Sequence, residues 1–151
     1  MTTAVESVDD RILTILDKGH TREGFIEVVH RFRELGIALA PTFIPFTPWT
    51  TREGYRDLLR LLLELQLLDS VSPVQLALRL LVPPGSRLLG HPEMDPYVSH
   101  FDPAALLHRW KHPDPSMDSL AARLLSLVAR EQKQRVCRRD IFAQIWTEAA
   151  E

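Results

Sequence analysis

Apolar side chains between residues 7 and 36 recur at intervals of three and four, the spacing of amphipathic helices. The pattern predicts two of them. Ser7 caps the first, which Gly19 ends in a left-handed turn, and Thr21 begins the second, which Gly36 ends.

The period then changes to two. Residues 37–44 and 74–82 alternate apolar side chains with other side chains, which predicts two strands. Pro41 weakens the first prediction because proline cannot donate to a sheet ladder. A leucine-rich helix from Arg52 to about Leu67 is expected between the strands, with Thr50 and Glu53 at capping-box spacing. A short strand that ends at Val5-Glu6-Ser7 fits before the first helix.

From Gly90 onwards the strand alternation disappears and aspartate–proline and histidine–proline pairs punctuate the chain. Asp102 and Ser116 have the positions of helix caps, and a last amphipathic helix is expected near the end of the chain. This predicts a boundary near residue 90, followed by a helical tail.

One short motif occurs twice. Residues 21–25 read TREGF and residues 51–55 read TREGY, and a similar apolar pattern follows each copy. A period of about thirty residues is typical of a strand–helix unit that has been repeated. Strands that alternate with helices predict a parallel sheet with helical crossovers.

Composition narrows the class of protein. Of 151 residues 45% are apolar, and the net charge of −2 gives no overall field toward nucleic acid or an anionic membrane. No apolar run approaches the roughly 20 residues that span a bilayer, and the start, MTTAVESVDD, has no signal pattern. We expect a cytoplasmic protein with neither nucleic acid nor membrane as a partner.

Three stretches, taken in order, resemble a known family. They are Val5-Glu6-Ser7 followed by Asp17-Lys18-Gly19-His20-Thr21, then residues 41–50 (PTFIPFTPWT), then Pro83-Pro84-Gly85-Ser86. Their order and spacing resemble the second half of the radical S-adenosylmethionine (radical SAM) barrel. The likeness is strongest to a bacterial branch with a cysteine- or selenocysteine-containing tail, whose tail motif has no counterpart around Cys137.

This resemblance implies an α/β fold. Residues 1–90 would form half of a parallel β/α barrel, from the end of the fourth strand to the sixth, and residues 91–151 would form a helical C-terminal tail. In the family, three cysteines hold a [4Fe–4S] cluster that binds and reduces S-adenosylmethionine. One cysteine cannot hold such a cluster, so this chain alone is expected to be inactive.

The resemblance also implies positions for the cofactor. Glu6 and Ser7 would lie near its ribose, Ile44 and Phe46 against its adenine, and Val82 and Pro83 at the border of the adenine. The family has a glycine-rich loop after the fifth strand, whereas this chain has prolines and threonines there.

Gln75 and Arg79 share one side of the second predicted strand. In a barrel that side faces the lumen, where Arg79 could hold a substrate carboxylate. A strand with one solvated face explains the same pattern, and both interpretations stay open.

Metal and thiol chemistry have little support. His108 and His112 have helical spacing, but Pro113 follows at once and nothing supplies the ligand spacing of a structural zinc site. We therefore expect no metal ligands and no catalytic residues in this chain. Cys137 lies among arginines that would favour its thiolate, yet a lone cysteine is more often incidental.

Two main hypotheses follow for function. The first is the C-terminal portion of a radical SAM enzyme, which contributes cofactor packing and substrate-side surface, with a missing N-terminal half-barrel or a second copy as its partner. The second is a non-catalytic protein-binding module, or degenerate remnant, that pairs through its leucine-rich helix. An all-helical interaction domain is a third option if residues 74–82 are helical.

Overall fold

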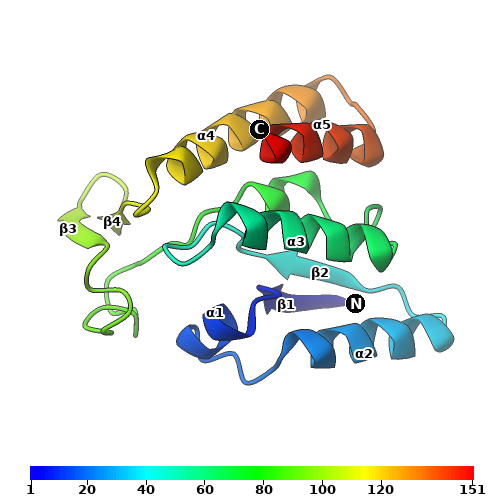
Figure 1. Ribbon diagram of the computed structural model, residues 1–151, viewed down its shortest axis with the longest axis horizontal. Helices are drawn as coiled ribbons and strands as arrows, with labels where there is room; N and C mark the ends of the chain where they lie inside the picture. Colours follow the sequence, from blue (N-terminus) through cyan, green and yellow to red (C-terminus); the bar gives the residue numbers. More distant parts are fainter.

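The computed structural model describes residues 1–151 and is an α/β structure (Figure 1). The elements in chain order are β1 (Thr2–Glu6), α1 (Asp10–Ile15), α2 (Arg22–Glu34), β2 (Ala40–Phe43), α3 (Arg52–Glu64), the 3₁₀ turn η1 (Pro73–Leu76), β3 (Val98–Asp102), β4 (Leu107–Trp110), α4 (Pro115–Lys133) and α5 (Arg138–Ala150).

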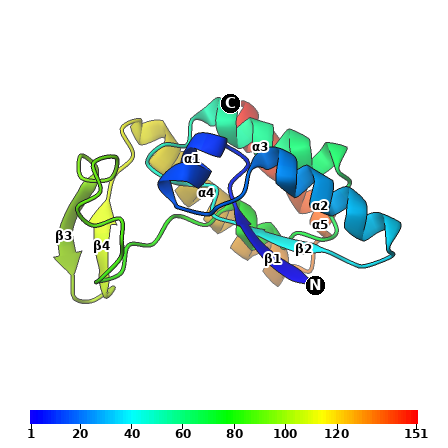
Figure 2. The same ribbon diagram turned by 90° about the horizontal axis from the view of Figure 1, so that it is seen from below.

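No parallel β/α barrel is present, so the predicted half-barrel is wrong. β1 and β2 form a parallel sheet of two strands, and β3 and β4 form a separate antiparallel sheet. In the parallel sheet Thr2 lies opposite Ala40 and Ala4 opposite Thr42. The outer edge of β1 has no neighbouring strand, so the sheet does not continue in that direction (Figure 2).

The strand predicted over residues 74–82 is not formed. Its first part is η1, which opens on a proline at a position where no backbone N–H is needed. The side-chain oxygen of Gln75 accepts the backbone N–H of Phe43 at 3.1 Å, so a side chain occupies the outer edge of β2 where a strand would pair. A single parallel bridge, between Phe46 and Arg79, then joins the two segments.

β2 is shorter than the alternation predicted and begins at Ala40 rather than Ile37. Ala40 donates its N–H to the carbonyl of Met1 at 2.8 Å. Because successive residues of a strand point their N–H groups in opposite directions, the nitrogen of Pro41 faces away from β1. Pro41 therefore costs the sheet no hydrogen bond.

The segment after residue 90 is not purely helical, which corrects the predicted helical tail. The β3–β4 hairpin lies where a helix capped by Asp102 was expected, and it projects from the rest of the molecule (Figure 1). The Asp102 carboxylate accepts N–H groups of Ala104 and Ala105 at 2.9 and 3.3 Å, so it stabilises the turn of the hairpin. α4 and α5 then pack side by side.

α3 lies at the centre of the molecule, between the parallel sheet and the α4–α5 pair (Figure 1). Its buried residues belong to a large core of 27 side chains that also draws on α2, α4 and α5. They are Tyr55, Leu58, Leu59, Leu61 and Leu62. Burial raises the pKa of Tyr55, and its hydroxyl donates to the carbonyl of Leu76 at 2.8 Å. The leucines that suggested a pairing surface are thus largely covered within this chain.

The repeated motif has one structural role in both copies. Thr21 and Thr51 are the N-caps of α2 and α3, and their hydroxyls accept the N–H groups of Gly24 and Gly54 at 3.1 and 2.9 Å. The cap expected at Thr50 is therefore at Thr51, and no capping box forms, because the third helical residue is Gly54. Thr50 instead bonds to the hydroxyl of Thr47 at 2.8 Å.

A second, smaller core lies beside the first. It comprises Leu80, Val82, Leu88, Met94 and Trp110. It joins the irregular segment after η1 to the β3–β4 hairpin, through a bridge between Val82 and His108. This small core forms the back of the pocket described next.

Candidate ligand-binding pocket

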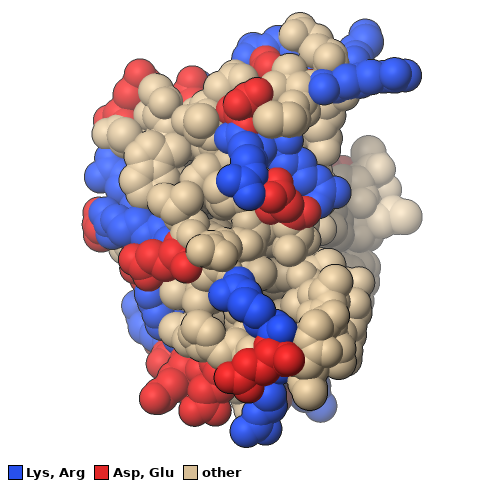
Figure 3. Space-filling model, turned by 90° about the vertical axis from the view of Figure 1, so that its right-hand side faces the viewer, with Lys and Arg blue, Asp and Glu red and all other residues tan.

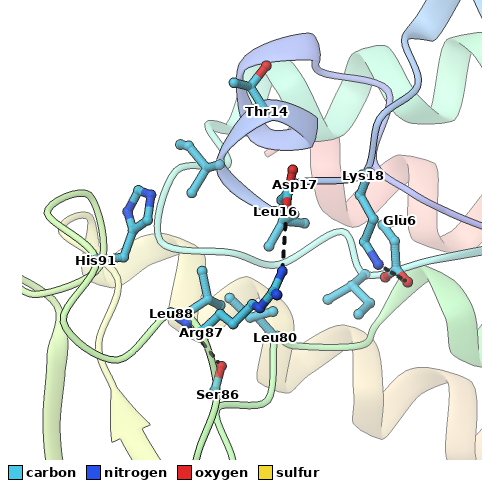
Figure 4. A pocket seen from close by; sticks show the side chains of 12 residues that line it. Glu6, Thr14, Leu16, Asp17, Lys18, Leu80, Ser86, Arg87, Leu88 and His91 are labelled. Atoms are coloured by element: carbon cyan, nitrogen blue, oxygen red, sulfur yellow. Dashed lines mark hydrogen bonds and ion pairs between the residues drawn. The ribbon is translucent and has the colours of Figure 1, made fainter.

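A pocket of about 650 Å³ opens where β1 and the segment after β2 end (Figure 4). The loop after α1 forms one side and residues 80–91 form the other. Ligands of α/β proteins commonly bind at the carboxyl ends of parallel strands, and the volume lies within the range of small-molecule sites.

Glu6 supplies the most enclosed carboxylate of this pocket, with 14% of its side chain exposed. It ends β1 with a backbone φ of 70°, where the pairing register shifts between Ala4 and Glu6. Its carbonyl accepts the N–H of Ile44 at 2.9 Å. Positive φ is costly for a residue with a side chain, so the local backbone is strained where the carboxylate enters the pocket.

Lys18 faces Glu6 from the loop after α1, with Nζ 3.2 Å from Oε1 of the carboxylate (Figure 4). His20 holds this loop against the end of β1. Its Nε2 lies 3.1 Å from the carbonyl of Val5, and its Nδ1 lies 3.3 Å from the carbonyl of Lys18. The Asp17–His20 stretch therefore presents the ammonium group to the carboxylate.

One part of the pocket lining is apolar. Ile44 follows β2, whereas Leu80 and Leu88 are buried members of the small core, and Leu16 faces them from the end of α1. Apolar walls with a few fixed polar groups are typical of sites for small organic molecules. The arrangement suits a ligand with a flat apolar part and a polar group that reaches Glu6.

An ion pair between Asp17 and Arg87 crosses the mouth of the pocket, with Nη1 of the guanidinium 3.6 Å from Oδ2 of the carboxylate (Figure 4). These side chains are 85% and 94% exposed, so the pair contributes little and opens readily. His91 lies at the far end of the pocket and accepts the N–H of Glu93 through Nδ1 at 3.2 Å. That contact leaves its Nε2 as the N–H donor.

Of the six predicted cofactor-binding residues, the structure brings Glu6 and Ile44 together in this pocket. Ser7 lies instead on an adjoining hollow of about 250 Å³, which shares Glu6 as a wall. Phe46 is buried and stacks on Tyr55 with ring centroids 4.9 Å apart.

Val82 and Pro83 do not line the pocket. Val82 is fully buried in the small core, and Pro83 is exposed on the turn that follows. Leu80, two residues earlier, lines the pocket instead. The resemblance named the end of a strand, but this segment forms no regular strand, so the side chain that faces the pocket could not be identified from spacing.

Gln75 and Arg79 do not share a strand face and do not line the pocket. Gln75 covers the edge of β2, as described above. The Arg79 guanidinium forms an ion pair with Asp118 and lies 4.0 Å from the centre of the Trp110 ring. Both side chains are therefore engaged in contacts within the chain.

Lys18, Leu80 and Leu88 were not selected from the sequence. Lys18 lies inside a stretch that carried the family resemblance, which was the one available signal for it. The two leucines have no signal of their own, since leucine is common throughout the chain. Their role depends on how residues 80–91 fold back over α1 (Figure 4).

No group of three or more histidine, cysteine, aspartate or glutamate side chains lies close enough to hold a metal ion. The Nε2 of His112 lies 2.9 Å from the carbonyl of Thr50. The ring of His108 packs against that of Phe101, with the ring centroids 5.4 Å apart. Cys137 is exposed at the start of α5. A [4Fe–4S] cluster does not fit these residues, because its ligation needs several thiolates close together.

Charged side chains of both signs are scattered over the face drawn in Figure 3, with uncharged surface between them. No helix combines the length and apolar character required to cross a membrane.

No protein-family model matches the chain. No solved structure matches it significantly. The resemblance to the radical SAM family therefore rests on the residues quoted above.

Proposed function

We propose that this chain is the cofactor-packing portion of a radical SAM enzyme and that it binds the adenosyl group of S-adenosylmethionine in the pocket at Glu6. One observation carries the proposal. Glu6 and Ile44, which the resemblance assigned to ribose and adenine from separate stretches, line a single pocket together with Leu80 and Leu88.

Glu6 is suited to bind the ribose. Lys18 contacts Oε1 of its carboxylate, which leaves Oε2 free to accept hydrogen bonds from the hydroxyl groups of the sugar. Hydrogen bonds to an ionised acceptor are roughly twice as strong as those between neutral groups. The carboxylate is mostly enclosed, so water competes poorly for it.

The adenine ring lies against Ile44 and the two leucines. Leu16, which directly follows α1, packs with Ile44 against the small core that contains Leu80 and Leu88, and these four side chains form the apolar part of the lining. This apolar patch favours contact with a ring, because burial removes apolar surface of the ligand from water. In the cofactor-packing role, these residues bind and orient the adenosyl group and exclude water from it.

The reductive step lies outside this chain. In the family a [4Fe–4S] cluster supplies the electron that cleaves S-adenosylmethionine, and the lone Cys137 cannot ligate such a cluster. The cluster-bearing residues must come from another segment or another chain. No observation favours the alternative of a module that pairs through α3, whose leucines are mostly buried, and that alternative stays a prediction.

Calorimetric titration of the full chain with adenosine and with S-adenosylhomocysteine tests the proposal. We expect both to bind, and Glu6→Gln to weaken both affinities about 10- to 100-fold, because hydrogen bonds to a charged group contribute about 1.5–3 kcal/mol. Glu53→Gln is the matched control. It removes an exposed carboxylate on α3, which pairs with Arg60 away from the pocket, and should leave both affinities unchanged.

Two results would overturn the proposal. One is the absence of saturable binding of either ligand by the unaltered chain. The other is binding that Glu6→Gln and Glu53→Gln weaken equally, because the carboxylate in the pocket would then have no special role.

A further inference from the structure

Trp110 ends β4 and is 8% exposed in the small core. Its indole N–H donates to the backbone carbonyl of Leu80 at 2.8 Å. The Arg79 guanidinium lies 4.0 Å from the ring centre and also donates to the carbonyl of Trp110 at 3.3 Å. Arg79 also forms an ion pair with Asp118 near the start of α4, so this helix holds the guanidinium against the Trp110 ring.

Leu80 is held from two directions. Its N–H donates to the carbonyl of Phe46 at 2.8 Å, on the side of the parallel sheet. Its carbonyl accepts the indole N–H of Trp110 in a buried contact, and the backbone of β4 pairs with this segment two residues further on, at Val82. A buried carbonyl without a partner is costly, so the indole fixes the backbone of Leu80.

This contact reaches the pocket through packing. Leu80 and Leu88 are members of the small core with Trp110, and Leu16 and Ile44 pack against the same core. All four of these aliphatic side chains line the pocket, whereas Arg79 and Trp110 do not. The width of the pocket therefore depends on where Trp110 holds Leu80.

We infer that Trp110 is a positioning residue of the ligand pocket, which sets the apolar wall through the carbonyl of Leu80 without touching the ligand. Arg79 supports it by stacking on the ring. The inference rests on the proposed function in that the ligand is an adenosyl compound, and it adds a determinant of affinity more than a hundred residues from Glu6 in the sequence.

Trp110→Phe tests the inference, because it keeps an aromatic ring and removes the indole donor. We expect the affinity for S-adenosylhomocysteine to fall about 3- to 10-fold, the effect of one lost hydrogen bond. Arg79→Lys, which keeps a cation for Asp118 and removes the stacked plane, should weaken binding in the same direction. The matched control is Ile145→Val, which perturbs the buried face of α5 in the large core and should leave affinity unchanged.

Methyl NMR spectra of the ligand-free proteins supply a readout that general loss of stability does not move. The readout is the set of NOE signals between the methyl groups of Leu16, Ile44 and Leu88, which reports their spacing rather than the ring current of Trp110. Trp110→Phe should change these signals, and Ile145→Val should not. If Trp110→Phe leaves both these signals and the affinity as they are in the unaltered chain, the inference is overturned. If the signals change but the unaltered chain binds no adenosyl ligand, the positioning role stands and the proposed function fails. If the unaltered chain binds the ligand and Trp110→Phe binds it equally well, the proposed function stands and the positioning role of Trp110 fails.

Discussion

Glu6 keeps a carboxylate at a backbone position that glycine would adopt without strain. Its φ of 70° lies in the left-handed region, which costs a residue with a side chain about 1–2 kcal/mol. Backbone strain of this kind is often found at active sites and ligand-binding sites. Other left-handed residues, such as Asp17, Gln66 and Arg135, directly follow the C-cap residues of helices, whereas Glu6 lies at the end of a strand.

Substitutions of Glu6 should reveal the backbone strain through their effect on the free energy of unfolding. We expect Glu6→Gly to change the free energy of unfolding by less than about 1 kcal/mol, because relief of strain offsets the lost Lys18 contact and the greater freedom of the unfolded chain. Glu6→Val should cost about 2 kcal/mol more than Glu6→Gly, because branching at Cβ makes positive φ worse. Urea titrations of the two variants make the comparison, and equal stabilities would show that the backbone is unstrained.

At the scale of elements, local signals predicted most helices but misplaced most of their caps, and they predicted the sheet poorly. The caps of α1, α3 and α4 are Asp9, Thr51 and Asp114 rather than Ser7, Thr50 and Ser116. The cap of α2 was predicted correctly at Thr21, because a cap depends on residues within one turn, whereas the cap of α3 was expected at Thr50 and is the Thr51 of the repeated motif. The predicted strand over residues 74–82 depended on whether a distant edge was free. The Gln75 side chain covers that edge at Phe43, and no spacing within the segment reveals such a contact.

The same limit applies to the pocket. Glu6 and Ile44 were accessible through the resemblance, because both lie in stretches whose order resembled a known family. Leu80, Leu88 and Trp110 meet only because residues 80–91 and the end of β4 fold together into the small core. Contacts between residues far apart in sequence leave no periodic pattern, so this wall could not be predicted.

The two copies of the TREG motif should respond differently to one substitution. A methyl group at Gly24 would lie 3.5 Å from the capping hydroxyl of Thr21, an ordinary contact, whereas one at Gly54 would lie 3.2 Å from that of Thr51, which is tight. Gly24→Ala should therefore raise the free energy of unfolding by about 0.5–1 kcal/mol, the usual gain inside a helix. Gly54→Ala should gain less or lose stability. Thermal or urea unfolding measures both, and equal gains would contradict this account of the caps.

At the scale of the whole molecule, the unpaired outer edge of β1 is the feature with most consequence for behaviour in solution. A free strand edge presents unpaired N–H and C=O groups on which another chain can pair, and charged side chains are one means of preventing this. Thr2, Thr3 and Ala4 supply no charge along this edge, although Glu6 lies at its end.

We therefore expect the isolated chain to self-associate. Size-exclusion chromatography with light scattering should show a dimer or larger species, and Ala4→Lys should shift it toward the monomer by placing a charge on the edge. Ser119→Lys, on the exposed side of α4, is the control and should leave the distribution unchanged. A single species of 17.3 kDa for the unaltered chain would contradict the expectation.

The size of the small core also determines the temperature at which the pocket is lost. Five buried side chains hold the back of the pocket, against 27 in the large core. Regions with few buried contacts open at a lower free-energy cost than the body of a protein. Heat should thus open the pocket at Glu6 while most helices remain intact, so a melting curve followed by helix content would overstate the temperature up to which the pocket persists.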